Sequence, residues 1–161
     1  CFIYQMSYSL FNIPKDKLDP VISNSKKNDL NWENYDECCN RTQIIMDDEF
    51  VNYIYKQTKL NFPININDTV CHYVKYNVTN MYEITPHDDH CKITIIVYLN
   101  KDSTINDSFI VENKHIENNY WSTNIDTYGC LVMWSDDEFG PTHYGKITGN
   151  GIREVLCLFL G

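Results

Sequence analysis

The chain has 161 residues, of which 43% are apolar and 14% aromatic, a composition typical of one folded globular domain. Its net charge of −9 argues against a nucleic-acid partner, because phosphate groups are bound by lysine and arginine. The longest apolar run, "ITIIVYL", is broken by Thr94 and is far too short to cross a membrane. We therefore expect a single domain over residues 1–161, with neither a nucleic acid nor a membrane as partner.

Two further features bear on the cellular compartment. The first residues, "CFIYQMSYSLFNIP", have neither the basic segment nor the small-residue cleavage site of a secretory signal peptide. The seven cysteines are odd in number and contain no C-x-x-C pair, so the pattern favours neither a disulfide framework nor a zinc knuckle. Together these features predict a reducing, cytoplasmic location.

Residues 1–68 are expected to form a supporting layer of helices and loops. Residues 15–39 carry many turn formers and little periodicity, which predicts mostly loop with short helical pieces. The stretch "DDEFVNYIYKQTKL", residues 47–60, predicts a helix. It has acidic residues at its start, a lysine near its end, and Phe50, Tyr53 and Ile54 at helical spacing.

Residues 69–161 have a different pattern, in which short β-type segments alternate with turns. The segments are "TVCHYVKYNV", "KITIIVYLN", "DSFIVEN", "YGCLVMW", "THYGKIT" and "GIREVLCLFL", and the last two are separated by a Gly-Asn-Gly turn. Strands at such regular spacing favour an antiparallel sandwich or barrel. The predicted architecture is mainly β, with N-terminal helices packed on a β-sandwich core.

The stretch "TPHDDHCKITIIVYLN" places two histidines around two aspartates, just before a strand. Residues two apart on an extended segment face the same way, so either His87 with Asp89 or Asp88 with His90 could share a face. Two histidines and one carboxylate on one face bind Fe(II) and leave the opposite face open. The H-x-D pattern alone is weakly specific, and a solvated acidic loop is the alternative.

A metal site of this kind needs a third ligand from a distant strand. His143 follows an apolar strand and a turn, whereas His72 and His115 are less suitably placed. Arg153 lies ten residues after His143, and if the two flank a hairpin, Arg153 would point into the same cavity. An arginine inside an apolar strand needs an anion, unless the strand lies at an edge and Arg153 points into solvent.

This ordered set resembles the iron(II)- and 2-oxoglutarate-dependent dioxygenases, and within them the prolyl 4-hydroxylase branch of hypoxia-sensing and collagen-type enzymes. His87-Asp88-Asp89, then His143, then Arg153 follow the family's order. The segments "YNVTNMYEITPHDD", "IIVYLN" and "YGCLVMWSDDEFGPTHYG" are similar to that branch, and the resemblance covers about residues 70–160. One departure is that residues 106–109, "NDSF", stand where the family usually has a Gly-Gly pair.

The resemblance implies a double-stranded β-helix, a jelly-roll or cupin-like sandwich, and it implies a role for each of several residues. His87, Asp89 and His143 would bind Fe(II), while Asp88 would point away. Arg153 and Tyr98 would hold the far carboxylate of 2-oxoglutarate. Ile96 and Phe109 would form the apolar sides of the cosubstrate pocket, and Tyr76 would lie near the metal-bound oxygens.

The implied activity is hydroxylation of a peptide or protein, most of all at proline, with release of succinate and CO2. It would require O2 and 2-oxoglutarate, with ascorbate as reductant, and the substrate would bind beside residues 103–109 and the N-terminal residues. Two alternatives stay open. One is a small-molecule oxygenase on the same fold, and the other is an inactive, cupin-like binding module.

Overall fold

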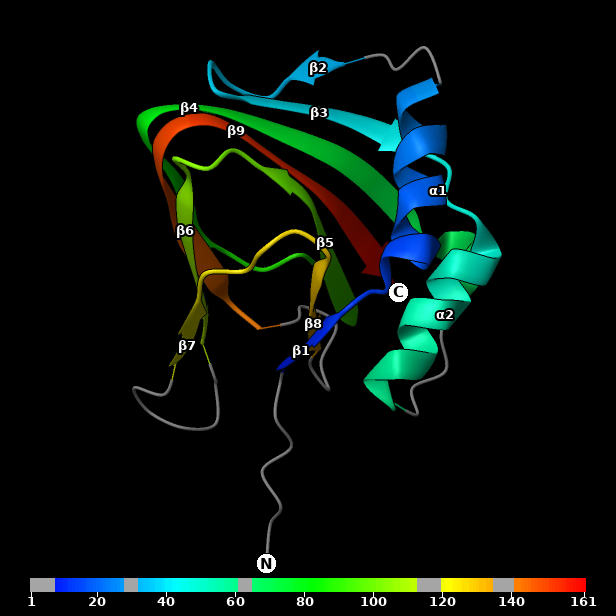
Figure 1. The fold of residues 1–161 in the computed structure, drawn as a ribbon. Coiled ribbons are helices and arrows are strands. Elements are labelled where there is room, and N and C mark those ends of the chain that lie inside the picture. Colours follow the sequence, from blue (N-terminus) through cyan, green and yellow to red (C-terminus); the bar gives the residue numbers. More distant parts are fainter. Residues whose placement is uncertain (1–7, 28–31, 61–64, 113–119, 135–140) are drawn as a thin grey trace, which may run out of the picture.

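The computed structural model describes residues 8–27, 32–60, 65–112, 120–134 and 141–161, and within them it is mainly antiparallel β, as predicted (Figure 1). Two helices lie to one side, and neither is long and apolar enough to span a membrane. The elements in chain order are β1 (Tyr8–Asn12), α1 (Lys15–Lys27), β2 (Glu33–Asn34), β3 (Cys39–Ile44), α2 (Asp48–Thr58), a 3-10 turn (Ile66–Asp68), β4 (Val70–His87), β5 (Ile93–Lys101), β6 (Asn106–Glu112), β7 (Tyr120–Thr123), β8 (Gly129–Trp134) and β9 (His143–Leu160).

The two longest strands, β4 and β9, form the spine of the fold. They pair antiparallel from Val70 opposite Phe159 to His87 opposite His143, and they arch together over the top of Figure 1. Residues 143–148 of β9 also pair with β6, whereas residues 153–160 pair with β5. One strand thus belongs to two differently oriented parts of the sheet, with the bend between them.

That bend lies at Gly149-Asn150-Gly151, where the sequence predicted a hairpin turn. The hairpin prediction is wrong, because Gly149 still pairs with Asn80 and Gly151 with Val78, so the chain bends without reversing. The two glycines have φ angles of +113° and +145°, which other residues rarely adopt, and this freedom lets the strand bend while it keeps its partner.

Strand β5 is buried on both faces, which explains why it reads as a continuous apolar run. Ile95 and Val97 pack in the same cluster as Ile54 of α2, on the side of the helices. Ile96 and Tyr98 belong to a second cluster on the opposite face. The helices therefore cover the outside of the sheet, and the inner face of β5 is left to line a cavity.

The N-terminal layer is more ordered than predicted. Helix α2 is confirmed, and the Asp47 side chain caps it by accepting a hydrogen bond from the Glu49 backbone N–H at 2.9 Å. Helix α1 replaces the expected loop with a helix of 13 residues. Among residues 15–24 of α1, for which burial is described, only Leu18 is fully buried, which explains why the sequence of this helix shows little apolar periodicity. Residues 8–44 also add β1, β2 and β3 to the sheet, since β1 pairs with β8 and β3 with β4.

We expect the bend in β9 to be intolerant of a side chain. Replacing Gly149 with alanine should lower the free energy of unfolding by about 1–3 kcal/mol, because a residue with a Cβ would be held at an unfavourable φ. That Cβ would also collide with the carbonyl oxygen of Thr104. Urea unfolding measures the change, with Gly161→Ala as the control because its Cβ would meet open space. Equal stability of Gly149→Ala and the wild type would contradict this account of the bend.

Candidate metal centre and its cavity

A cavity of about 430 Å³ lies against the inner face of the sheet. Strands β4, β5, β6 and β9 all contribute side chains to it. Every residue that the sequence singled out for the site lines this one cavity: Tyr76, His87, Asp89, Ile96, Tyr98, Phe109, His143 and Arg153. The structure therefore gathers the whole predicted set, although its members are spread over 78 positions of the chain.

His87 reaches the cavity because of an irregularity in β4. The register between β4 and β9 shifts between Ile84 and His87, next to Pro86, which cannot donate to the ladder. Residues 82–85 all line the cavity, but before the shift the more buried of them are the even-numbered Tyr82 and Ile84, and after it the odd-numbered His87 lines the cavity. The bulge re-aims the strand and sets His87 opposite His143, with ring centroids 4.3 Å apart.

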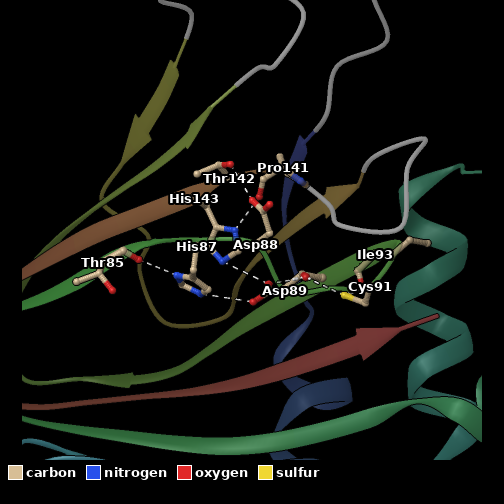
Figure 2. A network of polar contacts seen from close by, with 10 residues as sticks. Thr85, His87, Asp88, Asp89, Cys91, Ile93, Pro141, Thr142 and His143 are labelled. Atoms are coloured by element: carbon tan, nitrogen blue, oxygen red, sulfur yellow. Dashed lines mark hydrogen bonds and ion pairs between the residues drawn. The ribbon is translucent and has the colours of Figure 1, made fainter.

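Both imidazole rings are oriented by the backbone (Figure 2). The Nδ1 atom of His87 lies 2.7 Å from the carbonyl oxygen of Thr85, and the Nδ1 atom of His143 lies 3.0 Å from that of Pro141. A carbonyl oxygen only accepts hydrogen bonds, so in each ring Nδ1 carries the proton and donates it. In the neutral ring Nε2 then offers its lone pair, and both Nε2 atoms face Asp89.

Asp89 lies between the two rings. Its Oδ1 is 3.4 Å from Nε2 of His87, and its Oδ2 is 3.3 Å from Nε2 of His143. The hydroxyl of Thr94 donates a hydrogen bond of 2.6 Å to Oδ2 and fixes the carboxylate. Burial alone would raise the pKa of Asp89, but a hydrogen bond from a protonated His87, the charge of a protonated His143 and the hydrogen bond from Thr94 outweigh it and lower that pKa.

The two histidines differ in their surroundings. The side chain of His143 is 4% exposed, and burial lowers its pKa. The side chain of His87 is 43% exposed, and its hydrogen bond with Asp89 raises its pKa above the ordinary value. The centre is therefore closed on the His143 side and accessible on the His87 side, which suits a site that must admit other ligands.

Among the described residues, His87, Asp89 and His143 have ligand atoms that all lie within 4.8 Å of one another and could hold a metal ion. This donor set matches the two-histidine, one-carboxylate arrangement preferred by Fe(II). The other register does not converge, because Asp88 accepts a hydrogen bond of 2.7 Å from Thr142 and His90 is exposed with a φ of +53°. His72 lines the cavity but packs edge-on against Phe159, and His115 lies outside the described residues.

Arg153 is 1% exposed, which rules out the alternative of an edge-strand arginine in solvent. Its NH1 and NH2 groups donate to the carbonyl oxygens of Asn100 and Ile125, at 3.2 and 2.5 Å. The guanidinium carbon lies 4.2 Å from the centroid of the Tyr98 ring. Its Nε lies 2.8 Å from Oδ2 of Asp107, so the anion that this buried cation requires is supplied by the chain itself.

The remaining predicted residues form the walls. Ile96 and Phe109 are buried, and the Phe109 ring stacks on His143 with centroids 5.5 Å apart. Tyr76 lies opposite Arg153 in the strand register, with its ring 5.2 Å from that of Tyr82. These positions leave the metal ligands against an apolar wall.

Two important residues were not predicted from the sequence. Thr94 orients Asp89, and its only signal was that it interrupts an otherwise apolar strand. Asp107 pairs with Arg153, and its signal was its place in the "NDSF" segment, where a glycine pair was expected.

The chain shares its fold with 2-oxoglutarate–Fe(II) oxygenases. An oxidoreductase of that family from Burkholderia pseudomallei aligns with 96% of this chain and 84% of its own, at a TM-score of 0.70 and 9% identity. A prolyl-4-hydroxylase from Pseudomonas putida aligns with 96% of this chain and 91% of its own, at a TM-score of 0.68 and 13% identity. A prolyl hydroxylase from Trichoplax adhaerens was solved with a hypoxia-inducible-factor peptide fragment. It aligns with 96% of this chain and 83% of its own, at a TM-score of 0.62 and 14% identity. No family model and no curated protein matches the sequence.

The geometry predicts which side chains bind a metal. Replacing His87, Asp89 or His143 with alanine should abolish Mn(II) binding, because each change removes one of the three candidate ligands that cluster among the described residues. Replacing Thr94 with valine should weaken binding by about 10–100-fold, because the carboxylate loses its orienting hydrogen bond. Calorimetric titration with Mn(II) measures both effects.

The matched control for this titration is Asp88→Ala, which removes the neighbouring carboxylate that bonds to Thr142 instead. It should keep most of the affinity. Full affinity in Asp89→Ala combined with loss in Asp88→Ala would show that the other register forms the site.

Proposed function

We propose that the protein is an Fe(II)-dependent oxygenase that uses a 2-oxoacid cosubstrate to hydroxylate a peptide or protein, most of all at prolyl residues. The observation that carries this proposal is the convergence of His87, Asp89 and His143 in one cavity, with both Nε2 atoms facing the carboxylate. The shared fold with 2-oxoglutarate–Fe(II) oxygenases supports the same chemistry.

The protein's own residues would prepare the site for this reaction. When bound, ferrous iron would let O2 oxidise the 2-oxoacid, which loses CO2, and one oxygen atom of O2 enters the product acid and the other a substrate C–H bond. Two neutral imidazoles and one carboxylate leave such an iron with one net positive charge, which attracts the 2-oxoacid's carboxylate. Phe109 stacks on His143 and, together with Ile96, would keep water from this side of the centre.

Arg153 is the charged anchor that the cavity offers to the far end of a cosubstrate. An arginine fork binds a carboxylate strongly, and the fold neighbours support 2-oxoglutarate, which would yield succinate. The fit is incomplete, however, because Asp107 already contacts this guanidinium.

A peptide substrate is supported by the rim of the cavity as well as by the neighbours. Tyr35 is 62% exposed there and lies over Arg41, and Tyr82 donates a hydrogen bond of 2.7 Å to Asp36. Such aromatic and acidic side chains suit an extended chain with basic flanking residues. One fold neighbour was solved with a peptide fragment.

The second candidate is a small-molecule oxygenase on the same fold. It is favoured by the size of the cavity, since about 430 Å³ would enclose a metabolite without help from a partner. An inactive cupin-like module is less consistent with a complete His-Asp-His cluster.

The substrate class is tested by incubating the protein with Fe(II), ascorbate, proline-containing peptides and a matched panel of free metabolites. Parallel reactions contain 2-oxoglutarate or 2-oxovalerate. We expect one oxygen atom to be added to a prolyl residue, and more slowly as salt rises, because exposed charges are screened beyond about 8–10 Å at physiological ionic strength. Mass spectrometry locates the oxygen.

Asp89→Ala serves as the inactive control in these incubations, because it removes one of the three proposed ligands. Oxidation of a free metabolite, with no peptide modified at any salt concentration, would favour the small-molecule oxygenase instead.

A further inference from the structure

We propose that Asp107 selects the cosubstrate. Its carboxylate fills the anion position on Arg153, so the cavity favours a 2-oxoacid with an uncharged far end over 2-oxoglutarate. This inference rests on the proposed function, because it concerns the 2-oxoacid that would bind at the metal centre.

The position of Asp107 follows from the alternation of β6. Asp107, Phe109 and Val111 occupy the more buried positions of this strand, while Asn106 and Ser108 are exposed. Asp107 and Phe109 both line the cavity, two residues apart on one face of β6. Asp107 is therefore directed inward by the same strand geometry that places Phe109 against His143.

The guanidinium of Arg153 already has a carboxylate beside it. One N–H on each of NH1 and NH2 donates to a backbone carbonyl oxygen, and Nε lies 2.8 Å from Oδ2 of Asp107. The angle at Nε is too poor for a hydrogen bond, so this contact is held mainly by charge. Oδ1 of Asp107 is buried and has no hydrogen-bond partner among the described residues. A second carboxylate that approaches Arg153 would therefore lie close to the like charge of Asp107.

A charge count separates the two kinds of cosubstrate. A ferrous centre would carry one positive charge, and Arg153 and Asp107 cancel each other. For these groups, apart from the charged residues of the rim (Asp36, Arg41 and Glu83), a 2-oxoacid with a single carboxylate would make the sum of charges zero. The dianion 2-oxoglutarate would leave one uncompensated negative charge, and an unpaired buried charge is strongly unfavourable.

The other cation close to this end of the cavity is also neutralised. Lys101 extends toward Asp126, with Nζ 2.8 Å from Oδ1, and it donates a second hydrogen bond to Asn124. Lys101 therefore does not supply the missing positive charge without breaking its own pair. Among the described residues, the other cation that lines the cavity is Arg41, whose guanidinium carbon lies 4.7 Å from the centroid of the exposed Tyr35 ring at the rim.

The inference is tested by calorimetric binding to the Mn(II)-loaded protein, which needs no turnover. The probes are 2-oxoglutarate and 2-oxovalerate, which have the same number of carbons and differ by the far carboxylate. The variants are Asp107→Asn, which keeps the shape and removes the charge, and Asp107→Ala, which also opens space. Asp102→Asn is the control, because it removes an acidic group from the loop that precedes β6, and this group does not line the cavity. Thermal unfolding and Mn(II) affinity report whether each variant is folded.

We expect the wild type and Asp102→Asn to bind 2-oxovalerate more tightly than 2-oxoglutarate. In Asp107→Asn or Asp107→Ala, the ratio of the two dissociation constants should shift toward 2-oxoglutarate by at least about tenfold, because the like-charge contact is removed. A ratio that stays unchanged in every folded Asp107 variant, or tighter binding of 2-oxoglutarate by the wild type, would overturn this inference alone. If neither acid binds to any folded variant, the 2-oxoacid-dependent function fails and the inference falls with it.

Discussion

The antiparallel pairing of β4 with β9 is the constraint on which the candidate site depends. It brings His87 opposite His143 at one end and Tyr76 opposite Arg153 further along. Because the ladder is nearly continuous, backbone hydrogen bonds set the positions of His87, His143 and Arg153, whereas Asp89 lies in the short connection between β4 and β5. The helices stabilise the outer face of the same sheet, so its inner face can hold charged and polar groups.

Those groups form two electrostatically different ends of one cavity. Around Asp89 the chain gathers a carboxylate and two ring nitrogens, a donor set that could hold a metal cation. Around Arg153 the charges already balance, because Asp107 supplies the counter-charge. A ligand that spans the cavity is therefore attracted at the first end, while at the second it meets a pair with no net charge. Shape and hydrogen bonding, more than charge, would govern recognition there.

Much of the site could be predicted from the sequence because its pattern is local or ordered. The period of two along a strand left two registers open, and the resemblance to the dioxygenase family, through the order of its residues, chose the one that lines the cavity. Helix α2 could also be predicted from the sequence, since its capping aspartate and the spacing of its apolar residues are local signals.

The errors concern features that need a partner strand. The bend at Gly149 resembles a turn in sequence, and only its pairing with Asn80 shows that the strand continues. Strand β3 has weak alternation and exists through its pairing with β4. The contact of Asp107 with Arg153 joins β6 to β9 across 46 positions, and no short-range pattern encodes it. The double-stranded β-helix topology and the residue roles stay predictions.

The continuity of β9 has a consequence for how this protein can diverge. His143 and Arg153 lie on one strand, so the ten-residue interval between them fixes how far apart they lie and which face of the sheet each occupies. Inserting or deleting one residue there would turn every later side chain of β9 to the opposite face and carry Arg153 out of the cavity into the layer beneath the helices. A change of two residues would keep the face but move Arg153 along the strand by about 7 Å. Natural variants that keep the site should therefore differ in length elsewhere and hold this interval constant.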